Sequence, residues 1–143
     1  MVIPRFVSAA LAGRQLEIHG DGTQTRCFCH VADTIRALKG LADAREVSGE
    51  IFNVGSQNRI SISGLADQVR SLTQSDSEVR FVPYDEVYGL GIEDMQHRIP
   101  STEKIRAAIG WEPRLGLERI LVDVIDDKRR APIQVEEPAP AAG

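Results

Sequence analysis

The chain has 143 residues, of which 42% are apolar and 27% are charged, and its formal net charge is −4. This length and composition are typical of one soluble globular domain with a buried core. The acidic balance (pI about 5.4) disfavours a nucleic-acid partner, because a phosphate backbone demands a basic surface. No apolar run approaches the ~20 residues that span a bilayer, and no signal peptide is evident, so we expect no membrane partner.

The first part of the chain predicts one helix and two strands. Pro4 suits the first turn of a helix that ends before Gly13, and the apolar face of this helix comprises Phe6, Val7, Ala10 and Leu11. In LEIHG, apolar Leu16 and Ile18 alternate with polar residues, which is typical of a half-buried strand. A Gly-Asp-Gly turn at 20–22 then leads to a second extended run, TRCFCHV.

Helices and short strands continue to alternate after this run. Asp33 suits the N-cap of a helix, whose apolar stripe is expected to be Ile35, Leu38, Leu41 and Ala42. IFNVG (51–55) predicts a buried strand, Ser61 the cap of the next helix, and VRFVP another strand.

Two further helices are expected before the tail. Residues 84–94 are predicted to be irregular, and Ser101 suits the cap of a helix that Gly110 closes. Trp111 is expected in a satellite core, and residues 117–125 carry a clear amphipathic stripe. We therefore expect a mixed α/β domain over residues 1–130 and a disordered tail, rich in Pro, Ala and acid, over 131–143.

The GDGTQTRCF stretch raises the question of an anion site. Glycine-rich turns let backbone amides approach an anion, Thr23 and Thr25 can add hydroxyl donors, and Arg26 can make a two-pronged contact to a phosphate. The alternative is a hairpin turn with Arg26 as a solvated surface residue. In the same way, His97 and Arg98 lie either in a ligand-facing loop or in a surface loop.

Cysteine and histidine residues in the same region do not predict a metal site. Cys27 and Cys29 are one residue apart, so within a strand they point to opposite faces and suit neither a disulfide nor a zinc site. His19 and His30 add no second ligand pair, and we expect these residues to pack in strands. Unpaired thiols favour a reducing, cytoplasmic location.

Two motifs of dinucleotide-dependent enzymes are absent from the sequence. Neither GDGTQT nor GLGIED completes a G-x-G-x-x-G fingerprint between a strand and a helix. No tyrosine is followed by a lysine four residues later, because Tyr84 is followed there by Tyr88 and Tyr88 by Ile92. We therefore expect no cofactor-binding, catalytic or metal-ligating residue in this chain.

Six stretches occur in an order that resembles the C-terminal portion of NAD-dependent nucleotide-sugar epimerases and dehydratases, which are extended short-chain dehydrogenases/reductases. They are MVIPRFVSAALAG, LEIHGDGTQTRCFCHVAD, GEIFNVGS, ISISGLA, DMQHRIPSTEKIRAAIGWEP and LGLERIL. The resemblance implies the small substrate-binding lobe, with short strands and about five helices, without the Rossmann core. NAD and a tyrosine-lysine pair that moves hydride and proton at the sugar would belong to the rest of such an enzyme.

The same resemblance implies a site for a UDP-sugar. Leu16 and Ile18 would offer backbone groups to the base, and Arg26 would hold the diphosphate. Arg98 matches an arginine of the decarboxylase-like members and would also meet phosphate. Asp94 sits where some 4-epimerases place an acid for the ribose hydroxyls. The DMQHRIP pattern favours UDP-glucuronate decarboxylases and UDP-sugar 4-epimerases over dTDP-glucose dehydratases.

Two functions therefore stand side by side. In the first, the chain is the UDP-sugar-binding portion of an NAD-dependent enzyme and is inactive alone. In the second, it is a stand-alone binding or interaction module derived from that family. The second follows from IFNVG and LEIHG, strands that would rest on a larger body, so self-association through exposed apolar faces is expected.

Overall fold

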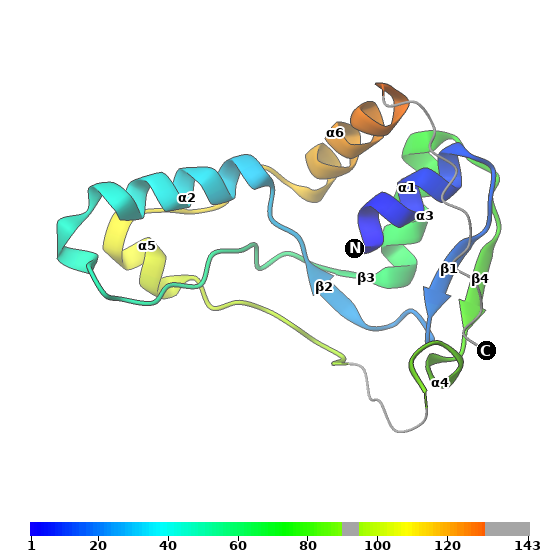
Figure 1. Cartoon of the computed structure of the whole chain (residues 1–143), viewed down its shortest axis with the longest axis horizontal. Coiled ribbons are helices and arrows are strands. Elements are labelled where there is room, and N and C mark those ends of the chain that lie inside the picture. Colours follow the sequence, from blue (N-terminus) through cyan, green and yellow to red (C-terminus); the bar gives the residue numbers. More distant parts are fainter. Residues whose placement is uncertain (90–94, 131–143) are drawn as a thin grey trace.

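The computed structural model describes residues 1–89 and 95–130 (Figure 1). Asp94 and the tail predicted to be disordered lie outside these residues. In chain order the elements are α1 (Val2–Leu11), β1 (Leu16–His19), β2 (Thr25–Cys27), α2 (Val31–Asp43), the 3-10 helix η1 (Arg45–Val47), β3 (Arg59–Ser61), α3 (Ile62–Thr73), β4 (Val79–Val82), α4 (Tyr84–Tyr88), α5 (Glu103–Ile109) and α6 (Leu117–Arg130). The expected mixture of α and β structure is confirmed, with six α-helices among the described residues rather than about five.

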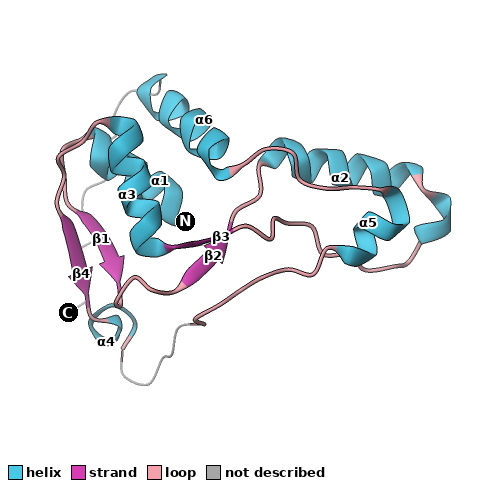
Figure 2. Cartoon of the chain, turned by 180° about the vertical axis from the view of Figure 1, so that it is seen from behind, coloured by secondary structure: helices cyan, strands magenta, loops and turns pink. Residues whose placement is uncertain are grey.

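The strands form two separate two-stranded sheets (Figure 2). β1 runs parallel to β4, and β2 runs antiparallel to β3 with Thr25 opposite Ser61. β1 and β2 are consecutive but do not pair, so the hairpin interpretation of the turn between them is wrong. The turn binds the start of α3 instead, because the Ser63 amide donates to the Gly22 carbonyl at 3.0 Å.

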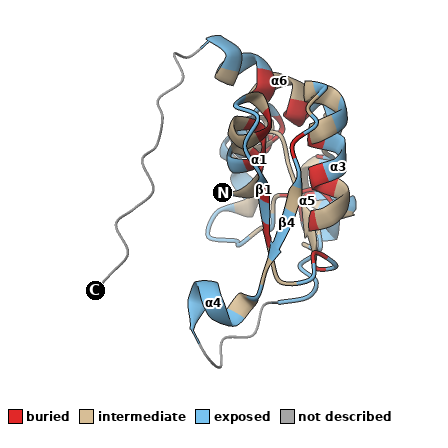
Figure 3. Ribbon diagram, turned by 90° about the vertical axis from the view of Figure 1, so that its right-hand side faces the viewer, coloured by how far each residue is buried: buried red, intermediate tan, exposed pale blue. Residues whose placement is uncertain are grey.

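The larger core lies where α1, α3 and α6 pack on β1, as the buried residues in Figure 3 show. Its fully buried side chains include Phe6, Leu16, Ile18, Leu65 and Leu121, which lie on the apolar faces predicted for these elements. The predicted cap of α3 is also confirmed, since the Ser61 Oγ accepts from the Gly64 amide at 3.0 Å.

A second, smaller core lies at the other end of the molecule, between α2 and α5 (Figure 1). Ala37, Ile105 and Trp111 are its buried members, and Phe52 and Val54 pack against them. The predicted satellite position of Trp111 is therefore confirmed.

Several predicted boundaries differ from the structure. β2 ends at Cys27, and α2 begins at Val31 with His30, not Asp33, as its N-cap. The His30 Nδ1 accepts from the Ala32 amide at 3.1 Å, so the imidazole takes the place of the expected carboxylate. The predicted irregular stretch begins with a helix, α4. Finally, α5 has Thr102 rather than Ser101 at its N-cap, without a side-chain capping bond.

Two apolar segments lack the partners that the sequence pattern implies. IFNVG is not a strand, because no neighbouring strand lies beside it in the described part of the chain. The predicted core stripe of α2 is confirmed only at Leu41, which packs against the smaller core. Ile35 and Leu38 are each 59% exposed, and Ala42 is exposed as well, so these three positions were predicted wrongly.

Candidate functional site

The residues predicted to contact phosphate meet at a junction between β2 and residues 95–98, which we name the β2 junction. Thr25 and His97 form a parallel bridge, and the Thr25 amide donates to the Gln96 carbonyl at 2.9 Å. The Thr25 Oγ1 and the His97 Nδ1 are also 2.9 Å apart. Segments about 70 residues apart in sequence are thus held side by side.

Arg26 is anchored within the β2 junction. Its Nη1 donates to the Met95 carbonyl at 2.8 Å and to the Thr25 carbonyl at 2.9 Å, which fixes the position of a half-buried guanidinium. Arg98, one residue beyond the bridge, is exposed. The sequence prediction placed both arginines in one site, and the structure brings their segments together. Asp94 lies outside the described residues.

A third arginine, which sequence reasoning missed, lies close to this junction. Arg59 on β3 is directly opposite Cys27, so it flanks β2 on the side away from residues 95–98. Among the described residues, neither Arg59 nor Arg98 lies within ion-pair distance of a carboxylate. Only the pairing of β2 with β3 brings Arg59 near, and no local motif indicates it.

The threonine hydroxyls predicted as anion donors already have partners in the structure. The Thr23 Oγ1 donates to the Asp21 carboxylate at 2.7 Å, and the Thr23 amide donates to the same oxygen at 2.9 Å. These bonds hold the pKa of Asp21 below its usual range. The Thr25 hydroxyl is likewise paired, with His97. An anion near β2 would therefore be bound by the arginines and not by these hydroxyls.

The predicted base-contacting strand, β1, offers backbone and not side chains. Leu16 and Ile18 have fully buried side chains, so only their backbone groups could meet a ligand. The Glu17 carbonyl already accepts from Arg5 at 3.3 Å, and one edge of β1 pairs with β4.

His19, at the end of β1, belongs to a polar and aromatic cluster that the sequence did not predict. Its Nε2 lies 3.3 Å from the Arg5 Nη2, and its Nδ1 lies 3.0 Å from the Tyr88 hydroxyl. Arginine can only donate, so Nε2 accepts and Nδ1 carries the proton. Burial and the Arg5 charge lower the pKa of His19, and the imidazole is therefore a neutral partner rather than a cation.

His30 links the candidate site to the helices on either side. Its Nε2 donates to the Asp123 carboxylate of α6 at 2.9 Å, while its Nδ1 caps α2. Arg119 also contacts Asp123, at 2.9 Å, and both bonds keep the pKa of Asp123 low. The segment that follows β2 is therefore bonded through His30 to both α2 and α6, and these bonds help to hold the strand that carries Arg26 in place.

The described residues do not fit NAD or a metal. The Gly20–Gly22 turn joins two strands, whereas a dinucleotide fingerprint needs a glycine-rich turn that opens a helix. Within residues 1–89 and 95–130 no three His, Cys, Asp or Glu side chains gather as a metal centre requires. Cys27 and Cys29 are free thiols, and burial raises the pKa of each.

Comparison with known proteins decides the family. The model of the family described as GDP-mannose 4,6 dehydratase matches residues 1–124. The chain belongs to this family. Its curated relatives include UDP-N-acetyl-alpha-D-glucosaminuronate decarboxylase of Bacillus cytotoxicus, which is 40% identical over 124 residues, or 87% of this chain and 38% of the relative. The resemblance to NAD-dependent nucleotide-sugar epimerases and dehydratases is confirmed at the level of the family.

Solved structures agree with this assignment. MoeE5 in complex with UDP-glucose and NAD is 29% identical with a TM-score of 0.80, and the alignment covers 91% of this chain and 42% of that one. UDP-glucose 4-epimerase of Thermotoga maritima, solved with UDP-glucose, is 25% identical with a TM-score of 0.77, covering 91% and 40%. The chain thus spans about two fifths of the length of these proteins. No helix among the described residues has the length and apolar character needed to cross a membrane.

Proposed function

We propose that this chain is the nucleotide-sugar-binding, C-terminal portion of an NAD-dependent UDP-sugar epimerase, dehydratase or decarboxylase. The observation that carries the proposal is the anchoring of Arg26 on β2, with Arg98 on the segment that bridges to the same strand. Two arginines from segments far apart in sequence suit the two phosphates of a nucleoside diphosphate, because guanidinium groups bind phosphate oxygens through paired hydrogen bonds.

We propose for each candidate residue the role that the family resemblance implies. Arg26 and Arg98 would neutralise the diphosphate, and the backbone of Leu16 and Ile18 would face the base. Asp94 would meet the ribose hydroxyls. Support comes from relatives of the same family, since MoeE5 was solved with UDP-glucose and NAD and the Thermotoga epimerase with UDP-glucose.

NAD and the chemical step belong, in this proposal, to a Rossmann portion outside this chain. NAD supplies hydride chemistry when it is bound there. This chain's own residues bind and orient the nucleotide sugar, and by doing so reduce the entropic cost of reaching the reactive geometry. We accordingly propose that the chain alone turns over no UDP-sugar. The free thiols Cys27 and Cys29 support a cytoplasmic location for the enzyme.

Calorimetric titration with UDP tests the site. Arg26→Ala should weaken UDP binding by roughly 1.5–3 kcal/mol, the cost of losing a charge-assisted hydrogen bond. Arg26→Lys should recover only part of the affinity, because it keeps the charge and loses the fork. Arg59→Ala is the matched control on the neighbouring strand. Equal losses for Arg26→Ala and Arg59→Ala, or no loss for Arg26→Ala, would refute a specific phosphate contact.

A second candidate function is a stand-alone interaction module, which one observation favours. Residues 51–57 make no backbone-to-backbone hydrogen bond with any other described residue. Unpaired backbone groups of an extended segment promote association with another chain or with a second copy of this one, as those of an exposed strand edge do. Self-association through this edge is the prediction of the module hypothesis, and solution mass measurements distinguish it from the first proposal.

A further inference from the structure

A cluster of side chains at the carboxyl end of β1, beside α4 (Figure 1), has no part in the proposed function. His19 accepts from Arg5 of α1 through its Nε2 at 3.3 Å, and its Nδ1–H donates to the Tyr88 hydroxyl of α4 at 3.0 Å. The same Arg5 Nη2 donates to the Glu17 carbonyl at 3.3 Å. One imidazole thus connects α1 to a helix whose contacting residue lies 69 positions further along the sequence.

Ring packing holds the imidazole in place as well as hydrogen bonding. The His19 ring meets the Tyr88 ring edge-on with the ring centres 5.5 Å apart, and Tyr88 packs on Tyr84 with the ring centres 4.5 Å apart. The side-chain amide of Gln24 donates to the His19 carbonyl at 2.7 Å, which fixes the backbone beside the ring. The imidazole is half-buried, so a change in its charge acts on its neighbours with less screening than at the open surface.

Charged side chains surround His19 on each neighbouring element. They are Arg5 on α1, Glu17 on β1, Asp21 in the following turn, Arg80 on β4, and Asp85 and Glu86 on α4. Burial and the Arg5 charge lower the pKa of His19, and Glu17 opposes them. Glu17 is itself paired with Arg80 at 3.6 Å, which reduces its attraction for a proton on the ring. The imidazole is therefore neutral while Arg5 lies against it.

A proton on the Nε2 of His19 changes one contact of the ring and leaves the other intact. Arginine can only donate, so a protonated Nε2 would set two donors and two positive charges against each other at the Arg5 contact. The Nδ1 keeps its hydrogen in both charge states, so its bond to the Tyr88 oxygen persists. Protonation therefore separates His19 from α1 and not from α4.

We propose that His19 is a pH-sensitive latch: the neutral imidazole holds Arg5 against β1, and protonation releases Arg5 while α4 stays docked through Tyr88. Release also uncovers the Glu17 carbonyl, to which Arg5 donates. The latch is closed at neutral pH and opens as the pH falls. It does not rest on the nucleotide-sugar site, because every contact in it lies within this chain.

The test is an NMR titration of the imidazole rings in the ¹⁵N-labelled full chain from about pH 8 to about pH 5, with His19→Gln to assign the His19 signals. The neutral His19 ring should carry its hydrogen on Nδ1, the reverse of the tautomer that predominates in unstructured peptides. The Arg5 side-chain signals should change with the same midpoint and become those of a mobile group. The Gly89 amide, which donates to the Asp85 carbonyl of α4 at 3.0 Å, should keep its protection from hydrogen exchange throughout.

Variants separate the two contacts of the ring. Arg5→Ala should raise the midpoint of the His19 titration, and Arg5→Gln should also raise it but retain the Nδ1–H tautomer, because glutamine keeps a donor and loses the charge. Arg14→Ala is the matched control, since it removes an exposed arginine just beyond α1 and should leave the midpoint unchanged. Tyr88→Phe should speed hydrogen exchange of the Gly89 amide about two- to tenfold, the equivalent of one neutral hydrogen bond.

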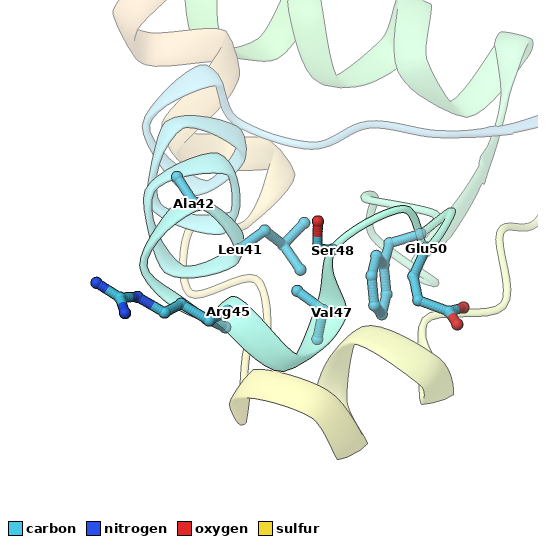
Figure 4. A pocket seen from close by; sticks show the side chains of 8 residues that line it. Leu41, Ala42, Arg45, Val47, Ser48 and Glu50 are labelled. Atoms are coloured by element: carbon cyan, nitrogen blue, oxygen red, sulfur yellow. The ribbon is translucent and has the colours of Figure 1, made fainter.

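The other end of the molecule supplies an internal reference. A hollow of about 590 Å³ lies there between the end of α2, η1 and residues 48–52. Figure 4 shows Leu41 and Val47 directed into this hollow, while the Arg45 side chain extends away from it. The hydrogen bond from Lys104 holds the pKa of Glu50, its one carboxylate, below the usual range. Amide shifts of residues 41–52 should therefore not follow the His19 midpoint.

Several results would overturn the latch. They are an Nε2–H tautomer of neutral His19, equal effects of Arg5→Ala and Arg14→Ala on its midpoint, or Arg5 signals that do not respond to the titration. A loss of Gly89 protection with the same midpoint would also overturn it, because the proton would then undock α4. A failure of UDP to bind would leave all of these results unaffected, so the two proposals fail separately.

Discussion

Replacement of the buried Asp33 by alanine should strongly destabilise the smaller core. Asp33 is 2% exposed, and its Oδ2 accepts from the amides of Arg114 and Leu115, each at 2.8 Å. Its Oδ1 pairs with Arg36 at 2.6 Å. The carboxylate therefore connects α2 to the segment that follows Trp111. The indole Nε1 of Trp111 also donates to the Asp33 carbonyl.

The magnitude follows from the groups left without partners. In Asp33→Ala two backbone amides lose their acceptor, at about 1–3 kcal/mol each. Arg36 is one-third exposed and regains water, so it adds less. We expect a loss of about 2–5 kcal/mol in the free energy of unfolding, measured by urea denaturation. Asp33→Asn retains one acceptor oxygen for the amides and should lose clearly less.

The pH dependence gives an independent check. Burial raises the pKa of Asp33, but the bonds from Arg36 and from the amides of Leu115 and Arg114 outweigh this effect and bring it below the usual range. The folded-state pKa is thus below the unfolded one, so the stabilisation is present above about pH 4 and is lost as the pH falls through the folded-state value. Asp33→Asn should remove this part of the acid sensitivity. An alanine variant that loses less than 1 kcal/mol would refute the reasoning.

Two other changes test how the candidate site is held. Gly22→Ala should lower the free energy of unfolding by roughly 1–3 kcal/mol, because φ is +76° and a methyl group would collide with the Ser63 side chain. Gly13→Ala is the control: its φ is +64° but the space around it is open, so it should cost only about 1 kcal/mol. Equal losses of stability in thermal unfolding would contradict this prediction. His30→Ala should lower the free energy of unfolding by about 1–2 kcal/mol, because it removes both the α2 cap and the contact to Asp123. His30→Asn keeps a capping acceptor and should cost about half as much in urea denaturation. Identical losses for the two variants would show that the cap contributes nothing to stability.

Local patterns predicted the elements whose apolar faces find partners within this chain. The faces of α1, α3 and α6 and the alternation in β1 lie where the sequence placed them, because their contacts form one core. The exposed positions of the α2 stripe and the IFNVG strand were predicted wrongly for the opposite reason. Ile35 and Ile51 have the periodicity of core residues, but nothing in the described part of the chain covers them. A sequence pattern indicates that a side chain is buried, but not which part of the protein covers it.

The candidate site depended on contacts that no local pattern contains. The GDG turn suggested a hairpin because glycine and aspartate permit that conformation, yet β1 pairs with β4 and β2 with β3. The approach of His97 to Thr25 joins residues 72 positions apart. The sequence named Arg26 and Arg98 through a family resemblance, and only the fold shows that their segments adjoin.

The central claim is that the β2 junction binds the diphosphate of a nucleotide sugar. The most direct test is a titration of the ¹⁵N-labelled chain with UDP, followed by backbone amide chemical shifts. We predict saturable changes confined to β1, β2 and residues 95–98, with losses of these changes in Arg26→Ala. Shifts confined to the hollow at residues 41–52, or no saturable change with UDP, would contradict the account.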